Sequence, residues 1–408
     1  MTITPNAGLP NGGDRWFLPD ELSKNLEDKY PGLSRDEAAE VLSAGWEFMR
    51  CLVPEFTSWE RYLAMTRLLT INLVAEFRAS AGDIAFGDLV CGYDIEELLG
   101  VVFGDTPVRE EMSREYRGML LLTAAKSGMS RHARLLSRLT EALANSPADY
   151  FRIRDCDFGS RFTFAGAMAC NEVSGGWLSE RENQILAEVA VGMYDAIAFH
   201  KHQAEGEICN VFAYSDPSLR PSVYRMYREA LWALDTTWSR SVAKRCVVNF
   251  ARYGGGPVHM LMRRYRFVEN GLVVGLPESE GTVAAASQNV KLWHHLAPGS
   301  SQAGETEVAG SYYRTVMAGE RKWLFPGLAN LLGQSNAARC PSCRPPEAHR
   351  AEETAGFGGM RLCNGCRSEW DAYLRDFPSR LKEVLETPCP SPRSVEMFAM
   401  RKFDVRDT

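Results

Sequence analysis

Apolar residues recur at three- and four-residue steps through most of the first 270 or so positions of the chain. This spacing places them on one face of a helix, and no stretch of useful length alternates apolar and polar residues as a half-buried strand does. Ser34 and Ser179 are each followed three residues later by Glu, which is the capping box that marks a helix start. The predicted helices cover approximately 34–51, 58–79, 94–103, 109–127, 132–144, 151–170, 180–205, 221–239 and 257–268. We therefore expect an all-α protein.

The composition changes towards the C-terminus. Ser, Gly, Ala and Glu dominate from about Pro277 to Gly310, which predicts a loop or a loosely packed connection, and Ala337–Cys366 is rich in turn-forming residues. We expect a single large helical bundle with a small C-terminal zinc-binding subdomain. The predicted divisions are a disordered tail over 1–15, the helical domain over 16–335, the zinc-binding subdomain over 336–370, and a C-terminal helix and tail over 371–408.

Composition and charge exclude some classes of partner. The 408 residues can bury a large core, and 45% of them are hydrophobic. A formal net charge of −6 gives no overall basic field for nucleic acid or an anionic membrane. The N-terminus lacks the apolar core of a signal peptide, and no run reaches the ~18 apolar residues of a membrane span. We expect a cytoplasmic monomer or homodimer that binds neither nucleic acid nor a membrane.

Four of the eleven cysteines are clustered. Cys340 and Cys343 form one C-x-x-C pair, Cys363 and Cys366 form another, and 19 residues separate the pairs. Each pair can place two thiolates on one turn, and two pairs complete a tetrahedral zinc site. Because four thiolates leave no open coordination position, the pattern predicts a structural Zn²⁺. Four free thiols or a redox pair is the alternative interpretation.

A carboxylate lies on the apolar face of the helix predicted over 58–79. Glu76 follows apolar and small residues on that face at three- and four-residue steps, namely Tyr62, Thr66, Leu69 and Leu73. Asp83 lies two turns beyond Glu76. A buried carboxylate is costly unless it is paired or binds a metal. Glu76 is therefore a candidate metal ligand, with a structural salt bridge as the alternative.

Two arginines alternate with two aspartates in the segment Phe151–Asp157. Arg152 precedes Asp155, and Arg154 precedes Asp157, each by three residues. The forked guanidinium suits diphosphate oxygens, and a partner carboxylate would fix its orientation. The alternative is a pair of surface ion pairs, which contribute little.

Polar residues gather near the end of the helix predicted over 180–205. They are Asp195, Lys201, His202, Glu205 and, just after the helix, Asn210. The apolar residues of this helix lie on a different face, so the helix packs on one side and presents a polar cluster on another. A solvated polar face is the alternative interpretation.

Three arginines occur within four residues near the end of the predicted helical region. Arg264 and Tyr265 belong to this group, and together they could hold an anion. A solvated basic helix face is the alternative interpretation.

Taken together and in this order, these segments resemble class I terpene cyclases. In that class an acid-rich helix and a second motif, usually N-D-x-x-S-x-x-K-E followed by G-E and an Asn, hold three magnesium ions. Asp195, Lys201, Gly206, Glu207 and Asn210 fall in register with the second motif. Arg152 lies about 42 residues before that motif, and the Arg264–Tyr265 pair lies about 70 residues after it, near the intervals of the class.

The chain also departs from the class. Tyr194, Ala198 and His202 stand where the usual Asn, Ser and Glu ligands would be, and Glu76 with Ser80 stands in place of D-D-x-x-D. Magnesium prefers hard oxygen ligands, so His202 is a poor substitute. Asp195 or Glu205 would then take over, or His202 and Lys201 would bind diphosphate directly.

A closer resemblance covers nearly the whole chain, from Trp16 to Leu381. The stretches AEFRAS, YFRIRDCD, YDAIAFHKHQAEGE, REALWALD and GGPVHMLMRRYRFVENGL, together with the two C-x-x-C pairs, are similar to the α-ionylideneethane synthase family. These are fungal sesquiterpene cyclases that lack the usual aspartate-rich motif, and the family includes α-humulene synthases. The resemblance implies farnesyl diphosphate as the substrate and a sesquiterpene hydrocarbon as the product.

The resemblance and the motifs together give an expected site. Glu76, Asp195, Arg264 and Tyr265 are the expected catalytic residues, and the expected Mg²⁺ ligands are Glu76, Asp83, Asp195 and Glu205. The expected substrate-binding residues are Arg152, Arg154, Lys201, His202, Asn210, Phe77 and Phe199. Aromatic rings stabilise cations, so Trp232 and Trp238 are further candidates beside Phe77 and Phe199, with plain core packing as the alternative.

Two other functions fit part of the sequence. A prenyltransferase uses similar metals but couples two substrates, and it normally has two aspartate-rich motifs, which this chain lacks. A helical zinc-ribbon interaction protein without chemistry would account for the cysteines. It would leave the carboxylate on the apolar face of the helix over 58–79 unexplained.

Overall fold

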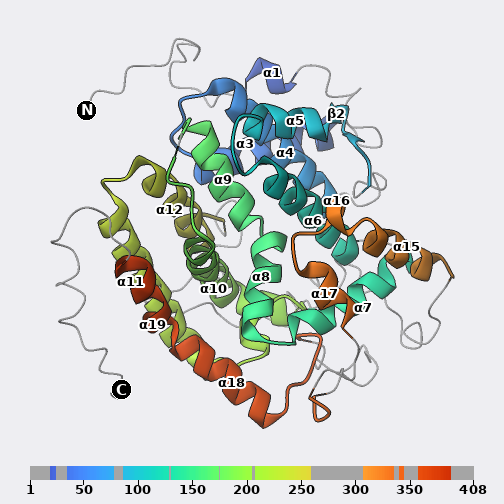
Figure 1. Ribbon diagram of the computed structural model, residues 1–408, viewed down its shortest axis with the longest axis vertical. Helices are drawn as coiled ribbons and strands as arrows, with labels where there is room; N and C mark the ends of the chain where they lie inside the picture. Colours follow the sequence, from blue (N-terminus) through green and yellow to red (C-terminus); the bar gives the residue numbers. More distant parts are fainter. Residues whose placement is uncertain are drawn as a thin grey trace.

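The computed structural model describes residues 19–23, 35–77, 86–127, 130–173, 175–204, 207–258, 307–334, 340–343 and 357–386. These residues form an α-helical protein, as the periodicity predicted, with one short antiparallel hairpin of two-residue strands (Figure 1). The elements up to the middle of the chain are α1 (Asp20–Ser23), α3 (Arg35–Leu52), α4 (Trp59–Phe77), β1 (Leu89–Val90), β2 (Tyr93–Asp94), α5 (Ile95–Phe103), α6 (Arg109–Ser127), η2 (Ser130–His132), α7 (Ala133–Leu143), α8 (Pro147–Asp157) and α9 (Ser160–Cys170). The remaining elements are α10 (Glu180–Ala204), η3 (Val211–Ala213), η4 (Pro217–Leu219), α11 (Arg220–Trp238), α12 (Val242–Gly254), α15 (Glu307–Ala318), α16 (Glu320–Trp323), α17 (Leu328–Gly333), α18 (Asn364–Arg375) and α19 (Phe377–Glu386).

The helices pack around a shared apolar core. α4 packs against α3, α5 and α6, while α10 packs against α8, α11 and α12. The nearly continuous buried face of α10 includes Ile185, Val189, Met193 and Ile197, which are the apolar positions that its sequence spacing indicated. α8 and α9 lie between these two groups and join them (Figure 1).

One predicted helix is divided in the structure. The segment 151–170 was expected to be continuous, but α8 ends at Asp157 and α9 begins at Ser160. Gly159 has φ 68°, in the left-handed region that residues with a Cβ rarely adopt, so the backbone changes direction at this residue. The break brings the C-terminal end of α8 and the N-terminal end of α9 together.

The sequence pattern missed several helices. α12 was not predicted, although Ser241 caps it by accepting a hydrogen bond from the Lys244 backbone N–H at 3.3 Å. The α15–α17 segment was also missed, and α15 begins inside the expected loop 277–310. Of the helix expected over 257–268, only residues 257 and 258 lie within the described part of the chain.

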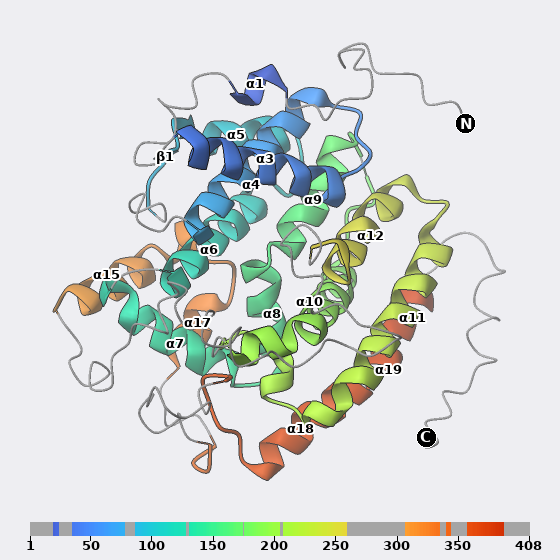
Figure 2. The same cartoon turned by 180° about the vertical axis from the view of Figure 1, so that it is seen from behind.

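The C-terminal helices cover the main bundle. α18 begins before residue 371, where the C-terminal helix was expected to start, and its Trp370 is buried. α19 packs against α10 and α11 and runs beside α11 in both views (Figures 1 and 2). α18 and α19 are therefore both attached to the helices of the main bundle.

Candidate functional site

A cavity that opens partly to solvent lies among α3, α4, α6, α8, α9, α10 and α12, and the centre of a water-sized sphere can occupy about 130 Å³ of it. Its apolar lining residues are Phe48, Leu52, Met65, Leu69, Leu73, Met119, Phe158, Phe162, Phe250, Tyr253 and Val258. Its polar lining residues are Asn72, Glu76, Thr123, Lys126, Arg154, Asp157, Thr163, Tyr194, His202, Glu207 and Cys209. A cavity in which an apolar wall meets a group of convergent polar side chains is a usual form of a small-molecule site.

Two basic side chains, Lys126 and Arg154, line one part of this cavity together with the carboxylate that they share, Asp157. We call these three residues the cation cluster. The Lys126 ammonium pairs with Asp157 Oδ1, and the Arg154 guanidinium pairs with Asp157 Oδ2. The Arg154 and Asp157 side chains are only 5% and 3% exposed. The predicted R-x-x-D pair is thus present here, and it is a buried pair rather than a surface one.

Electrostatics keep the cation cluster charged. Burial alone would raise the pKa of Asp157, but Lys126 and Arg154 outweigh burial and lower it. Burial opposes the charge of Lys126, yet Asp157 raises the pKa of this lysine above its ordinary value. Two basic side chains are therefore held ionised at the cavity wall, which is the arrangement that an anionic ligand requires.

Glu76 lies where the sequence predicted, on the cavity-facing side of α4. Among the described residues, neither a hydrogen bond nor an ion pair is formed by its carboxylate, so the alternative of a structural salt bridge has no support there. Asn72, one turn earlier on the same face, also lines the cavity, and its buried Oδ1 has no hydrogen-bond partner within the described part of the chain. Carboxylate and amide oxygens are the ligands that Mg²⁺ prefers, so this pair of side chains fits a magnesium ion.

Asp195 does not line the cavity, although it is adjacent to residues that do. Its carboxylate is fully buried and accepts hydrogen bonds from the Tyr150 hydroxyl at 2.6 Å, the Val211 backbone N–H at 2.9 Å and Arg154 Nη2 at 3.1 Å. Burial raises the pKa of this carboxyl, while Arg154 acts in the opposite direction. Protein donors occupy both oxygens, so the geometry makes Asp195 the partner that orients Arg154.

The residues expected on and after the end of α10 have different positions. His202 is buried and lines the cavity, with its Nδ1 3.0 Å from the Asn210 side-chain nitrogen. Asn210 is fully buried and does not line the cavity, because its side chain donates to the Asp195 carbonyl and caps η3. Lys201 is half-buried and is also absent from the cavity wall.

The structure places Arg152 away from the cavity. Its guanidinium pairs with the buried Glu115 carboxylate, lies 3.7 Å from Asp155 Oδ2 and stacks 3.6 Å from the centroid of the Phe325 ring. These contacts join α6, α8 and the segment before α17. Only the second arginine of the R-x-R segment therefore reaches the cavity.

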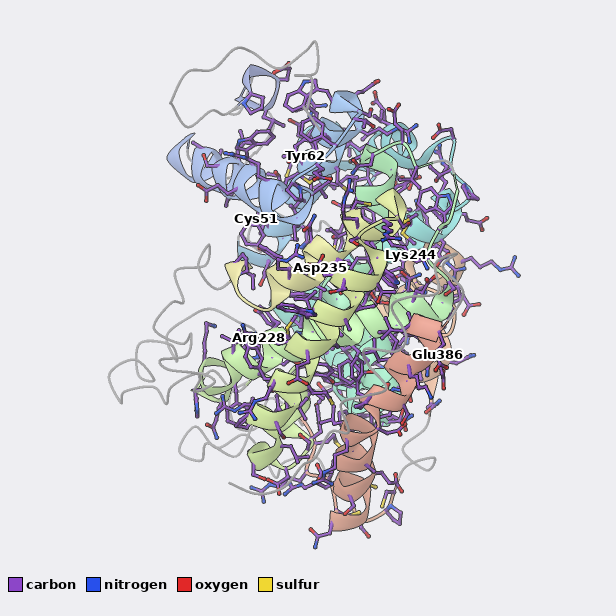
Figure 3. The ribbon with its side chains drawn as sticks, turned by 90° about the vertical axis from the view of Figure 1, so that its left-hand side faces the viewer. Cys51, Tyr62, Arg228, Asp235, Lys244 and Glu386 are labelled. Atoms are coloured by element: carbon purple, nitrogen blue, oxygen red, sulfur yellow. The ribbon has the colours of Figure 1, made fainter. Side chains whose placement is uncertain are left out.

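Three of the four expected aromatic residues have described side chains, and none of these three lines the cavity. Phe199 is buried against His200 and Phe357, and Trp238 is buried in α11, but neither lines the cavity. The suggestion that Trp232 stabilises a cation is wrong, because this side chain is 76% exposed. It lies on α11 between Arg228 and Asp235, which are also exposed and are labelled in Figure 3.

Other aromatic side chains take their place. Phe158, at the α8–α9 break, has its ring centroid 4.8 Å from that of Tyr194 and 5.4 Å from that of Phe250. Tyr253 is 6.4 Å from Phe250 in the same measure. These four rings and Phe162 line the cavity, and they come from α9, α10, α12 and the turn between α8 and α9.

Several expected residues lie outside the described part of the chain, namely Asp83, Glu205, Arg264 and Tyr265. Phe77 ends α4, but its side chain also lies outside that part. The structure thus brings together Glu76, Arg154 and His202 from the expected set. To these it adds Asp157, the predicted partner of Arg154, and Glu207, which falls in register with the second motif. It also adds Asn72 and Lys126, which the sequence did not single out.

A signal for Lys126 was available in the sequence. Met119, Thr123 and Lys126 are spaced by four and three residues and share one face of α6, and all three line the cavity. A lysine on an otherwise apolar helical face has the same significance as Glu76 on α4. Lys126 is identified as part of the site only by its neighbours on α8, Arg154 and Asp157, and the sequence does not show that α8 lies beside α6.

The cysteine clasp, formed by Cys340, Cys343, Cys363 and Cys366, has the geometry of a metal site. The four sulfur atoms lie within 4.8 Å of one another, and those of Cys340 and Cys363 are 3.7 Å apart. A tetrahedron with Zn–S bonds of ~2.3 Å has sulfurs ~3.8 Å apart, so the four thiols fit a zinc ion. The Cys363 backbone N–H also donates to Cys343 Sγ at 3.3 Å. The clasp can therefore bind a metal such as zinc.

No helix in the described part of the chain combines the length and apolar character that crossing a bilayer requires.

The family model described as alpha-ionylideneethane synthase aba3 matches residues 14–387. Alpha-ionylideneethane synthase abl3 of Leptosphaeria maculans is 39% identical over 93% of this chain and 87% of the relative. Alpha-ionylideneethane synthase aba3 of Botryotinia fuckeliana is 39% identical over 91% of this chain and 83% of the relative. A further alpha-ionylideneethane synthase, abl3 of Pyricularia oryzae, is 35% identical over 94% of this chain and 86% of the relative.

Proposed function

The chain belongs to the alpha-ionylideneethane synthase family, as its sequence resemblance predicted, and from this membership we propose that it is a sesquiterpene cyclase acting on farnesyl diphosphate. The observation that carries the proposal is the cavity, in which an aromatic, apolar wall meets two cations, Lys126 and Arg154, and the Glu76 carboxylate, which has no partner among the described residues. A prenyl diphosphate has the matching form, since an apolar chain is joined to a highly charged end.

In the proposed complex the diphosphate lies against the cation cluster. Lys126 and Arg154 offer several N–H donors to its oxygens, and their charge stabilises the negative charge that develops as the carbon–oxygen bond breaks. Asp195 holds Arg154 from behind, so the guanidinium is already oriented before substrate binds. Asp157 balances both cations when no diphosphate is present.

The charges around the cavity favour a divalent cation as cofactor. Among the described lining residues the carboxylates of Glu76, Asp157 and Glu207 outnumber the basic side chains of Lys126 and Arg154. A diphosphate adds several more negative charges, so cations must enter with it. We propose that Glu76 and Asn72 hold Mg²⁺, with Asp83 and Glu205 as the remaining predicted ligands. Bound Mg²⁺ would supply Lewis-acid stabilisation of the leaving diphosphate.

Loss of diphosphate leaves an allylic cation, and in the proposed reaction the apolar wall of the cavity stabilises this cation and keeps it from water. The rings of Phe158, Tyr194, Phe250 and Tyr253 present π-faces and edges to the cavity and can stabilise positive charge as it moves along the chain. The same wall excludes water, which would otherwise quench the cation to an alcohol. Loss of one proton gives the hydrocarbon, and the released diphosphate is an available base. Arg264 and Tyr265 remain predicted diphosphate-binding residues.

The test is to incubate the purified protein with farnesyl diphosphate and Mg²⁺ and to analyse the volatile products. A sesquiterpene hydrocarbon supports cyclisation, a longer prenyl diphosphate supports the prenyltransferase alternative, and unchanged substrate supports a non-catalytic protein. Glu76→Gln should lower turnover by at least about a hundredfold. Glu60→Gln is the matched control, because Glu60 is an exposed glutamate on the same helix. Equal activity of the Glu76→Gln and Glu60→Gln variants would show that Glu76 is not part of the site.

A further inference from the structure

The cysteine clasp lies at the start of two series of buried contacts that end at the cavity. We propose that the clasp positions Arg154 and Glu207, and thereby sets the geometry of the charged part of the cavity. The effect of the clasp on catalysis rests on the proposed function. The positioning of Arg154 and Glu207 by the clasp does not, because it concerns contacts among described residues and can be tested without a substrate.

The first series runs through α18. This helix begins directly after Cys363, carries Cys366, and presents Trp370 one turn further along the same face. Trp370 is 1% exposed, and its ring centroid lies 5.5 Å from that of Tyr150 and 4.8 Å from that of Tyr214. The clasp therefore anchors the turn from which Trp370 enters the core.

Tyr150 carries the contact on to the cavity. Its ring is fully buried against Trp370, and its hydroxyl donates to Asp195 Oδ2 at 2.6 Å. The other oxygen of Asp195 accepts from Arg154 Nη2 at 3.1 Å. Each group in this series is buried, so none can be displaced without leaving a polar group unpaired or a void in the core.

The second series runs through the segment before Cys363. The Gly358 backbone N–H donates to the Glu207 carbonyl at 3.1 Å, and the Phe357 ring lies 5.3 Å from that of Phe199 on α10. Gly358 has φ 71°, and a Cβ at this position would lie 2.4 Å from the Ala213 Cβ, so only glycine fits this approach. Glu207 itself lines the cavity.

Tyr214 connects the two series. Its ring contacts both Trp370 and Tyr150, and its hydroxyl donates to the Ile208 carbonyl at 3.0 Å, next to Glu207. α8 and the segment after α10 are thus both held by residues that lie close in sequence to Cys363 and Cys366, namely Trp370 and Gly358. A metal that fixes these cysteines would fix both walls of the charged part of the cavity.

The direct test is amide hydrogen exchange on the protein as purified, with its metal content measured, before and after zinc chelation. We expect exchange to become about tenfold faster in peptides covering α8 and residues 207–214, while α3 and α5 keep their protection. Loss of protection confined to residues 340–375 would overturn the inference. So would a purified protein that contains no metal and yet protects α8 and 207–214.

Chelation could unfold the whole chain, so a second comparison uses the metal-loaded protein. Trp370→Phe keeps all four cysteines but removes part of the ring between α18 and Tyr150, and Tyr150→Phe removes only the hydroxyl that holds Asp195. Trp238→Phe is the control, because Trp238 is equally buried and does not line the cavity. Faster exchange in α8 for the first two variants but not the control supports the inference, and equal behaviour of all three overturns it.

Binding and turnover separate this inference from the proposed function. Calorimetry with inorganic diphosphate and Mg²⁺ should give a Kd about tenfold weaker for Tyr150→Phe than for the unmodified chain. If no hydrocarbon forms from farnesyl diphosphate but the exchange pattern changes as expected, the proposed function fails and the positioning role stands. If hydrocarbon forms but hydrogen exchange in α8 does not change on zinc chelation, the positioning role is refuted and the proposed function stands.

Discussion

A buried ion pair between Arg380 and Glu188 joins α19 to α10. Arg380 Nη2 donates to both oxygens of Glu188 at 2.6 and 2.8 Å, and Tyr227 and Tyr373 donate to the same carboxylate at 3.0 and 3.2 Å. The Glu188 and Arg380 side chains are 3% and 11% exposed. Arg380→Met should leave a carboxylate buried in α10 without a cation, while keeping most of the packing volume of the arginine.

The magnitude follows from this environment. Removing one partner of a buried pair costs about 3–5 kcal/mol, and the two tyrosine hydroxyls that remain on Glu188 place the cost near the lower end, at about 3 kcal/mol. For a chain of this length that corresponds to a fall in Tm of about 3–4 °C. Burial already raises the pKa of Glu188, and Arg380 opposes that rise. Without Arg380 the folded-state pKa rises further, so the cost should shrink as the pH falls and Glu188 becomes protonated.

The assay is urea unfolding of Arg380→Met at two pH values, with Arg181→Met as the control. Arg181 and Glu383 also join α10 to α19, at 2.7 Å, but their side chains are 36% and 65% exposed. An exposed pair contributes about 0–1 kcal/mol, so the control should lose little stability. Equal losses for the two variants, or an Arg380→Met loss below about 1 kcal/mol, would refute the reasoning that burial makes this pair decisive.

Three further predictions concern the cavity and the clasp. The pKa of the Asp157 carboxyl is lowered in the folded protein. The ionised carboxylate therefore stabilises the fold fully above the pKa of the unfolded chain, ~3.9, and this stabilisation is lost as the pH falls through the folded-state pKa. Asp157→Asn should accordingly flatten the dependence of the unfolding free energy on pH below about 4. Gly159→Ala should cost about 1–2 kcal/mol in chemical unfolding, because φ is 68°. The new Cβ would lie 2.8 Å from Met119 Sδ, which must move, and Met119 lines the cavity. The ratio of volatile products should therefore also change, and an unaltered ratio would show that this turn does not affect the shape of the cavity. Chelation of the clasp metal should lower the Tm, and an unchanged Tm would contradict a structural role for that metal.

The sequence by itself determined the helical class, the clasp and the family. Apolar spacing identifies which face of a helix is buried, because burial of that face dominates helix stability in proteins, and α10 shows the correspondence residue by residue. Two C-x-x-C pairs are specific because zinc accepts few ligand sets, and the four sulfurs do lie together. Glu76 was found because a carboxylate on an apolar face is costly unless it has a function.

Only the tertiary structure decided which buried polar residues belong to the cavity. Arg152 and Arg154 are equivalent in the sequence pattern, yet one pairs with Glu115 beneath Phe325 and the other reaches the cavity beside Lys126. Asp195 matches a metal-binding position of the wider class, but three protein donors occupy its oxygens. Periodicity fixes the direction of a side chain relative to its own helix, whereas its partner depends on the neighbouring helix, which is set by packing over the whole chain.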